Sequence, residues 1–204
     1  MYKPIDVTKA LTVATLATGI LWTGLSPAAA LQNGDFSSGF TGWAGQAGSD
    51  DVDLPSTNFD ASSGAATLTT NYGDGSSGGA YALHLFQTFD LQALSPAIAG
   101  LQLSFTASWS ADDATGGDIW IAQLIDMSDA SHFLDLTTGV SSFDVTGFSG
   151  RSVQLQFGLE NIAGADDKLT IDSIAITARQ GAVPVPGTLV LLSIGLVALR
   201  RQVF

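Results

Sequence analysis

The chain has 204 residues, contains no cysteine, and carries a formal net charge of −12 at pH 7. The lack of cysteine excludes disulfide-stapled scaffolds and enzymes that use a thiol nucleophile. The acidic balance disfavours binding to nucleic acid or anionic lipid, because like charges repel. Such a surface is most often simply solvated, although it also suits divalent cations.

The N-terminal 30 residues have the organisation of a secretory signal peptide. A start with two lysines leads into an apolar stretch over residues 10–25, which a Ser-Pro pair ends. Ala28 and Ala30 then stand at the −3 and −1 positions that signal peptidase requires. We therefore predict a signal helix within residues 1–30, cleavage after Ala30, and Leu31 as the first mature residue. The alternative is a retained membrane anchor.

Residues 31–180 form the next unit. They hold 18 acidic side chains, 17 of them Asp, and only three basic ones. A segment of this length is the usual size of a single domain. Gly, Ser, Thr and Asp dominate it, whereas the helix formers Lys, Glu and Arg are scarce. The composition predicts one mainly β domain.

Period-two alternation locates the strands of this domain. Apolar residues stand at every second position over residues 101–109 and 153–159, and also over residues 83–91 except for Gln87, which shares their parity. Residues 118–125 are apolar more continuously, which predicts a central strand. Residues 169–177 change parity between Ile171 and Ile174, which predicts a β-bulge.

Turn-forming residues separate these strands. We expect glycine-rich loops over residues 71–79 and 110–118, and a polar, loop-rich segment over residues 45–64. Short strands with such turns favour an antiparallel β-sandwich of the jelly-roll type.

Both ends of the domain are similar to galactose-binding-like jelly rolls, a group that includes carbohydrate-binding modules. The resemblance rests on the sequence LQNGDF at residues 31–36, on Phe40 and the Gly42-Trp43 pair after it, and on IDSI at residues 171–174. It implies a β-sandwich in which the first and last strands meet, and a role in sugar recognition.

The same resemblance implies a structural calcium ion that links the first strand to the last. The residues in the corresponding places are Asp35 and Asp172, and carboxylate oxygens are ligands that calcium prefers. Other carboxylate groups offer further candidates: Asp50, Asp51, Asp53, Asp112, Asp113, Asp166 and Asp167. The alternative interpretation is turn chemistry, since Asp forms local hydrogen bonds in loops.

Aromatic side chains are the candidates for sugar contact. Trp120 stands on the opposite parity from Ile119 and Ile121, Tyr72 falls in a glycine-rich loop, and Trp43 belongs to the Gly-Trp pair. We predict Trp120, Tyr72 and Trp43 as possible ligand-binding residues. Packing is the alternative for each of them, because aromatics dominate cores. Trp109 follows the apolar parity of its strand and is expected in the core.

Evidence for catalysis is weak. The only histidines are His84, on the polar parity of its strand, and His132, near an expected turn. A Gly-x-Ser-x-Gly sequence occurs at residues 75–79, but it falls in an expected glycine-rich polar loop with no helix after it, and no glycine motif for phosphate precedes a helix. Asp residues are too numerous for any one pair to indicate a glycosidase. We expect no catalytic residues and no enzyme.

The C-terminus carries a short apolar run over residues 188–199 and then two arginines. As a helix with about 1.5 Å rise per residue it is roughly 18 Å long, less than a bilayer core of about 30 Å. This length alone indicates either a weak membrane span or a buried helix. The positive-inside rule places the arginines in the cytoplasm.

This segment resembles the PEP-CTERM sorting signal of Gram-negative bacteria. The residues that carry the resemblance are Pro184, Val185, Pro186, Gly187, Arg200 and Arg201, with Val185 in place of the usual Glu. The resemblance implies a sorting motif in residues 181–187, a transient membrane helix with a basic tail in residues 188–204, and processing by an exosortase.

Together these features predict a protein exported through the inner membrane of a Gram-negative bacterium to the cell surface or extracellular polysaccharide matrix. Its partners are signal peptidase, exosortase, the membrane in passing and polysaccharide, but not nucleic acid. The main hypothesis is a surface or biofilm-matrix protein without catalytic activity. The alternative is a carbohydrate-binding module with a defined sugar site, and a secreted hydrolase is the third hypothesis.

Overall fold

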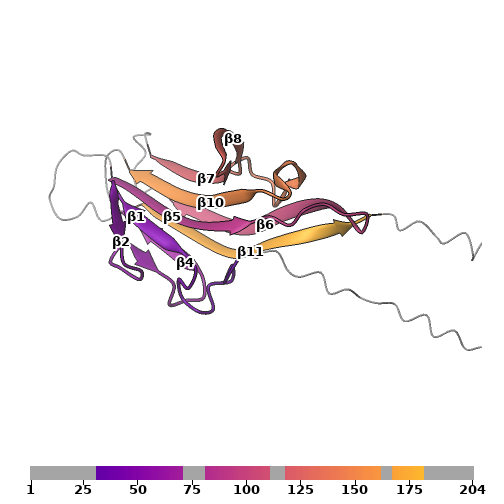
Figure 1. The fold of residues 1–204 in the computed structure, drawn as a ribbon. Helices are drawn as coiled ribbons and strands as arrows, with labels where there is room; N and C mark the ends of the chain where they lie inside the picture. The colour runs from indigo at the N-terminus through magenta and orange to yellow at the C-terminus, as the bar shows by residue number, and fades with distance from the viewer. Residues whose placement is uncertain (1–30, 71–80, 111–117, 162–166, 182–204) are drawn as a thin grey trace, which may run out of the picture.

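The computed structural model describes residues 31–70, 81–110, 118–161 and 167–181, which form two antiparallel sheets packed face to face (Figure 1). The six-stranded sheet has the order β2-β1-β5-β10-β7-β8. Its strands are β1 (Ala44–Ala47), β2 (Asp50–Val52), β5 (Tyr81–Asp90), β7 (Ile119–Asp126), β8 (Asp129–Asp135) and β10 (Ser152–Asn161).

The five-stranded sheet has the order β3-β4-β11-β6-β9. Its strands are β3 (Phe59–Asp60), β4 (Ala66–Thr69), β6 (Ile98–Ser110), β9 (Ser142–Asp144) and β11 (Lys168–Gln180). A single 3₁₀ turn, η1 (Thr146–Phe148), is the helical element among the described residues. The protein is thus a mainly β antiparallel sandwich, as the alternating pattern predicted.

The core lies between the two sheets. β10 places Val153, Leu155, Phe157 and Leu159 inward, all with no exposed surface. The ring of Phe157 meets that of Phe105 from β6 edge to face, with centroids 5.1 Å apart. Within the described ranges, the buried side chains of both sheets form one core cluster.

The parity change in β11 is a β-bulge, as expected. Its register against β6 shifts between Asp172 and Ala175, and Ser173 adopts a φ of 57°. The extra residue lets both Ile171 and Ile174 point into the core, where they are buried.

Residues 45–64 are loop-rich, as expected, and also hold most of β1 and all of the short strands β2 and β3. One expectation was wrong. Trp109 is 41% exposed although it follows the core parity of β6. β9 pairs only with residues 102–104 of β6, so the end of β6 that carries Trp109 has a neighbour on one side only. The segment 71–79 lies outside the described residues, as does most of 110–118.

Gln87 joins the N-terminal segment to β5 from a buried position. Its Oε1 accepts a hydrogen bond from the backbone N–H of Gln32 at 2.6 Å, and its Nε2 donates to the carbonyls of Gln32 and Gly42, each at 3.0 Å. The side chain is only 4% exposed.

We expect Gln87→Ala to lower the free energy of unfolding by about 2 kcal/mol, because it leaves polar backbone groups unpaired. Urea denaturation measures this loss, and hydrogen exchange at the Gln32 amide should become faster. Gln102→Ala, on the outer face of the five-stranded sheet, is the control. Equal stability of the two variants would contradict the role of Gln87.

Candidate functional site

Trp43 belongs to the core. Its side chain is 7% exposed and packs against Phe36 and Phe157, with ring centroids 5.3 and 6.3 Å away. Its Nε1–H donates to the carbonyl of Asn33 at 3.3 Å. An edge of Trp43 lines a shallow depression that also includes Thr41 and Asp53.

Trp120 lies across the six-stranded sheet from Trp43, because β5 and β10 separate β1 from β7. It points between the sheets, half-buried against the core, and lines a hollow of about 300 Å³ with Phe105, Ala107 and Val140. The two tryptophans therefore do not form one site.

Asp35 and Asp172 come from segments that the fold brings together, since the N–H of Ile174 donates to the carbonyl of Gly34 at 2.9 Å. Asp35 Oδ1 accepts from the N–H and hydroxyl of Ser37, which lowers the pKa of Asp35. Among the described residues, no three His, Asp or Glu side chains gather in a group able to hold a metal ion. Calcium binding stays a prediction.

Several predicted residues lie outside the described part of the chain. They are Tyr72, Asp112, Asp113, Asp166, the cleavage-site residues Ala28 and Ala30, and the sorting residues Pro184, Val185, Pro186, Gly187, Arg200 and Arg201. Both predicted terminal helices fall there too. Within the described ranges, no helix is long and apolar enough to cross a membrane.

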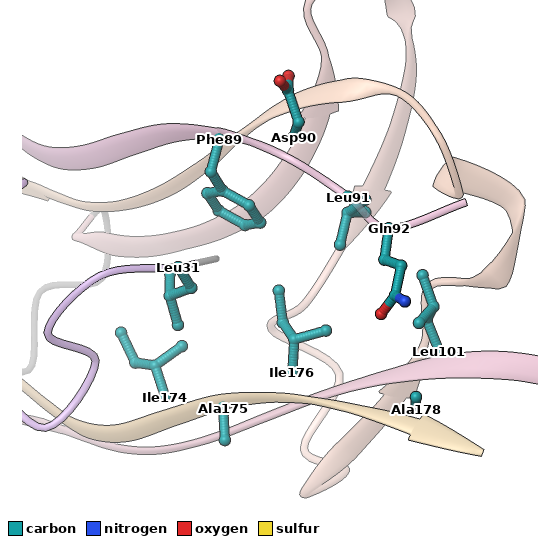
Figure 2. Close-up of a pocket in the computed structure, with 10 residues that line it drawn as sticks. All are labelled: Leu31, Phe89, Asp90, Leu91, Gln92, Leu101, Ile174, Ala175, Ile176 and Ala178. Carbon is teal, nitrogen blue, oxygen red and sulfur yellow. The ribbon is translucent and has the colours of Figure 1, made fainter. Parts of the chain in front are cut away.

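Leu31, the predicted first mature residue, lines an apolar hollow of about 340 Å³ between the sheets (Figure 2). Phe89 and Leu91 face it from β5 and the residue after it, and Ile174 and Ile176 face it from β11. Gln92 is among its few polar residues. The hollow presents apolar walls and lacks the convergent polar groups of a sugar site.

A buried carboxylate joins β7 to β8 and to the start of β10. Asp126 accepts hydrogen bonds from Ser128 and from the Arg151 guanidinium, and these bonds hold the pKa of its carboxyl far below the usual range. Its other contact is His132 Nδ1, at 3.3 Å. His132 lies in β8, which begins directly after the turn at residues 127–128, and its ring stacks on Phe148 with centroids 4.4 Å apart. This arrangement stabilises the fold and offers no poised nucleophile.

The two outer faces of the sandwich differ in chemistry. On the five-stranded sheet the outward residues are mainly small hydroxyl side chains: Thr67, Thr69, Gln102, Ser104, Thr106, Ser108, Thr170 and Thr177. On the six-stranded sheet they are mainly amides and large apolar groups, a set we call the amide face: Gln46, His84, Phe86, Ile121, Gln123, Ile125, Phe133, Gln154 and Gln156.

The register arranges the amide face in three rows across neighbouring strands, of which β10 and β7 run side by side in Figure 1. The central row holds Phe86, Gln156 and Gln123. One flanking row holds Gln46, His84, Gly158 and Ile121, and the other holds Thr88, Gln154, Ile125 and Phe133. Phe133 is 53% exposed.

The rows contain no cation at neutral pH, and their carboxylates stand at the two edges, where Asp51 of β2 pairs with Gln46 and Asp135 of β8 pairs with Gln123. Burial lowers the pKa of His84 below its ordinary value of 6.5, although nearby Glu160 opposes the shift. Gln156 Nε2 lies 2.8 Å from His84 Nδ1. Because an amide nitrogen only donates, Nδ1 accepts, and the proton of the neutral imidazole resides on Nε2.

Such a face can hold a molecule that has both hydroxyl groups and apolar C–H surfaces. A primary amide offers donors and an acceptor to hydroxyl groups, and Phe and Ile offer apolar contact. Neither Trp43 nor Trp120 lies on this face. The recurrent Gln in alternating strands was the available signal, but only the register places those amides in adjacent rows.

No protein-family model matches the chain, and no curated protein matches it by sequence. Among solved structures, the fold is similar to one described as TmCBM61 in complex with β-1,4-galactotriose, with a TM-score of 0.46. The two sequences are 16% identical, and the match covers 74% of this chain and 98% of that chain. It is also similar to a CBM4 structure, with 17% identity, 71% and 99% coverage, and a TM-score of 0.39. These neighbours are carbohydrate-binding modules, but likeness at this level carries no argument about the ligand.

Proposed function

We propose that this protein is an exported, non-catalytic surface or matrix protein whose sandwich binds neutral polysaccharide on the amide face. The observation that carries the proposal is the contrast between the two outer faces. An ordinary solvated sheet face carries small polar side chains, and the outer face of the five-stranded sheet is of this kind. The amide face instead combines amides with large half-buried apolar groups.

The ligand class follows from charge. The amide face offers hydrogen bonds without a cation to attract carboxylate or sulfate groups, and the chain around it is strongly acidic. An anionic polysaccharide is therefore repelled, while a neutral one forms hydrogen bonds and apolar contacts at no electrostatic cost.

The predicted cellular destination of the protein and its proposed ligand class agree. The signal peptide over residues 1–30 and the PEP-CTERM-like segment over residues 181–204 support export, followed by exosortase processing near the membrane. A glycan-binding domain released there meets the extracellular polysaccharide matrix. Calcium at Asp35 and Asp172 belongs to the proposal as a structural element only.

We expect the domain of residues 31–181 to bind at least one neutral polysaccharide saturably in a panel of dextran, soluble galactan, soluble xylan and hydroxyethylcellulose. Alginate and polygalacturonate should bind at least about tenfold more weakly, because of charge repulsion. Isothermal titration calorimetry measures the affinity for the neutral and for the anionic polymers, at low and high salt, with calcium and with chelator. Binding to the neutral polymers should persist at high salt.

Absence of binding to all four neutral polymers overturns the proposed ligand class. The remaining function is then that of the main sequence-based hypothesis, a structural surface or matrix protein.

A further inference from the structure

We propose that the imidazole of His84, held over Gly158, is the flat ring on which a sugar stacks, and that binding requires its neutral form. This inference rests on the proposed function and specifies its centre. It assigns Gly158 a positioning role and gives the site a dependence on pH.

The position of the ring follows from two neighbours on β10. A Cβ added to Gly158 would meet His84 Nδ1 at 2.7 Å and His84 Cε1 at 3.2 Å. The imidazole therefore leans across β10 into the space that any other residue would fill. The bond from Gln156 Nε2 to Nδ1, at 2.8 Å, holds it there.

This arrangement places the imidazole over Gly158, as the floor of the amide face. Gly158 has no side chain to stand between His84 and Ile121, its partners on either side in the flanking row. Phe86 and Gln156 border the floor in the central row. An aromatic ring beside amides supplies an apolar surface for sugar C–H groups and donors for hydroxyl groups.

Protonation of His84 disrupts the floor. An imidazolium carries a hydrogen on each nitrogen, so Nδ1 no longer accepts from Gln156 Nε2, and either the ring or the amide must move from its present position. The charged groups near this side chain are Glu160 on β10 and Asp51 on β2. The carboxylate of Asp51 accepts a hydrogen bond from Gln46, which lies in the same row as His84. Burial outweighs Glu160, so the neutral form persists at neutral pH, and binding is lost as the pH falls through the pKa of His84.

Three variants of residues 31–181 test the inference against the same four neutral polymers between about pH 7.5 and pH 5. His84→Ala should lose about tenfold in affinity at the upper pH, since the ring is gone. His84→Phe should stay within about threefold of the wild type there and lose the pH dependence, because it keeps a ring that does not titrate. Gly158→Ala should weaken binding and raise the pKa of His84, read from its imidazole NMR resonance, because the displaced ring gains solvent.

The outcomes separate this inference from the proposed function. If Phe86→Ala loses binding while His84→Ala and Gly158→Ala bind as the wild type does, the glycan site stands and the stacking role of His84 is wrong. If His84→Phe is as weak as His84→Ala, the ring is not a stacking floor. If the wild type binds none of the polymers, the proposed function and this inference both fail. Thermal unfolding of each variant verifies that it is folded.

Discussion

Phe86→Ala is expected to lower the affinity for a neutral polysaccharide by about tenfold or more, corresponding to about 1.4 kcal/mol. Phe86 is half-buried in the central row of the amide face, beside Gln156. Full burial of an aromatic side chain contributes roughly 1.5–3 kcal/mol, and a bound sugar would cover part of its remaining surface. Calorimetric titration with the polymer that the wild-type domain binds best measures the loss.

A matched pair of glutamines controls for general effects of substitution. Gln123→Ala removes an amide from the central row, whereas Gln102→Ala removes one from the outer face of the other sheet; both positions are half-buried. The first should lose about threefold to tenfold in affinity, as expected for one hydrogen bond, and the second should lose none. Equal behaviour of the two variants would contradict the assignment of the site to the amide face.

Phe157→Ala should destabilise the fold by about 3–5 kcal/mol. Phe157 has no exposed surface, and its ring contacts those of Phe105 and Trp43 at the centre of the sandwich. Truncation leaves a cavity between two sheets that cannot close around it. Because a whole domain has only about 5–15 kcal/mol of stability, such a loss should lower the urea midpoint severely or abolish folding.

Phe133→Ala is the matched control for that substitution. Phe133 is 53% exposed on β8, at the edge of the amide face, so its removal should change the free energy of unfolding by less than about 1 kcal/mol. If the two Phe variants were equally stable, the centre of the core would be elsewhere.

The amino-acid pattern alone determined the fold class and most of the core. Alternating apolar residues in β5, the first part of β6 and β10 predicted which side chains point inward, because the side-chain period of a strand is two. The parity change between Ile171 and Ile174 predicted the bulge for the same reason. Trp109 was misplaced because alternation reports the direction of a side chain and not how far a neighbouring strand extends to cover it.

Only the tertiary structure decided where the candidate site lies. Gln123, Gln156 and Phe86 are separated by up to 70 positions in sequence, and nothing local indicates that they share one row. Their adjacency depends on the pairing of β10 with both β5 and β7, since a shift of one residue would send each side chain to the opposite face. The burial that lowers the pKa of His84 and the close approach to Gly158 likewise arise only once these strands pair.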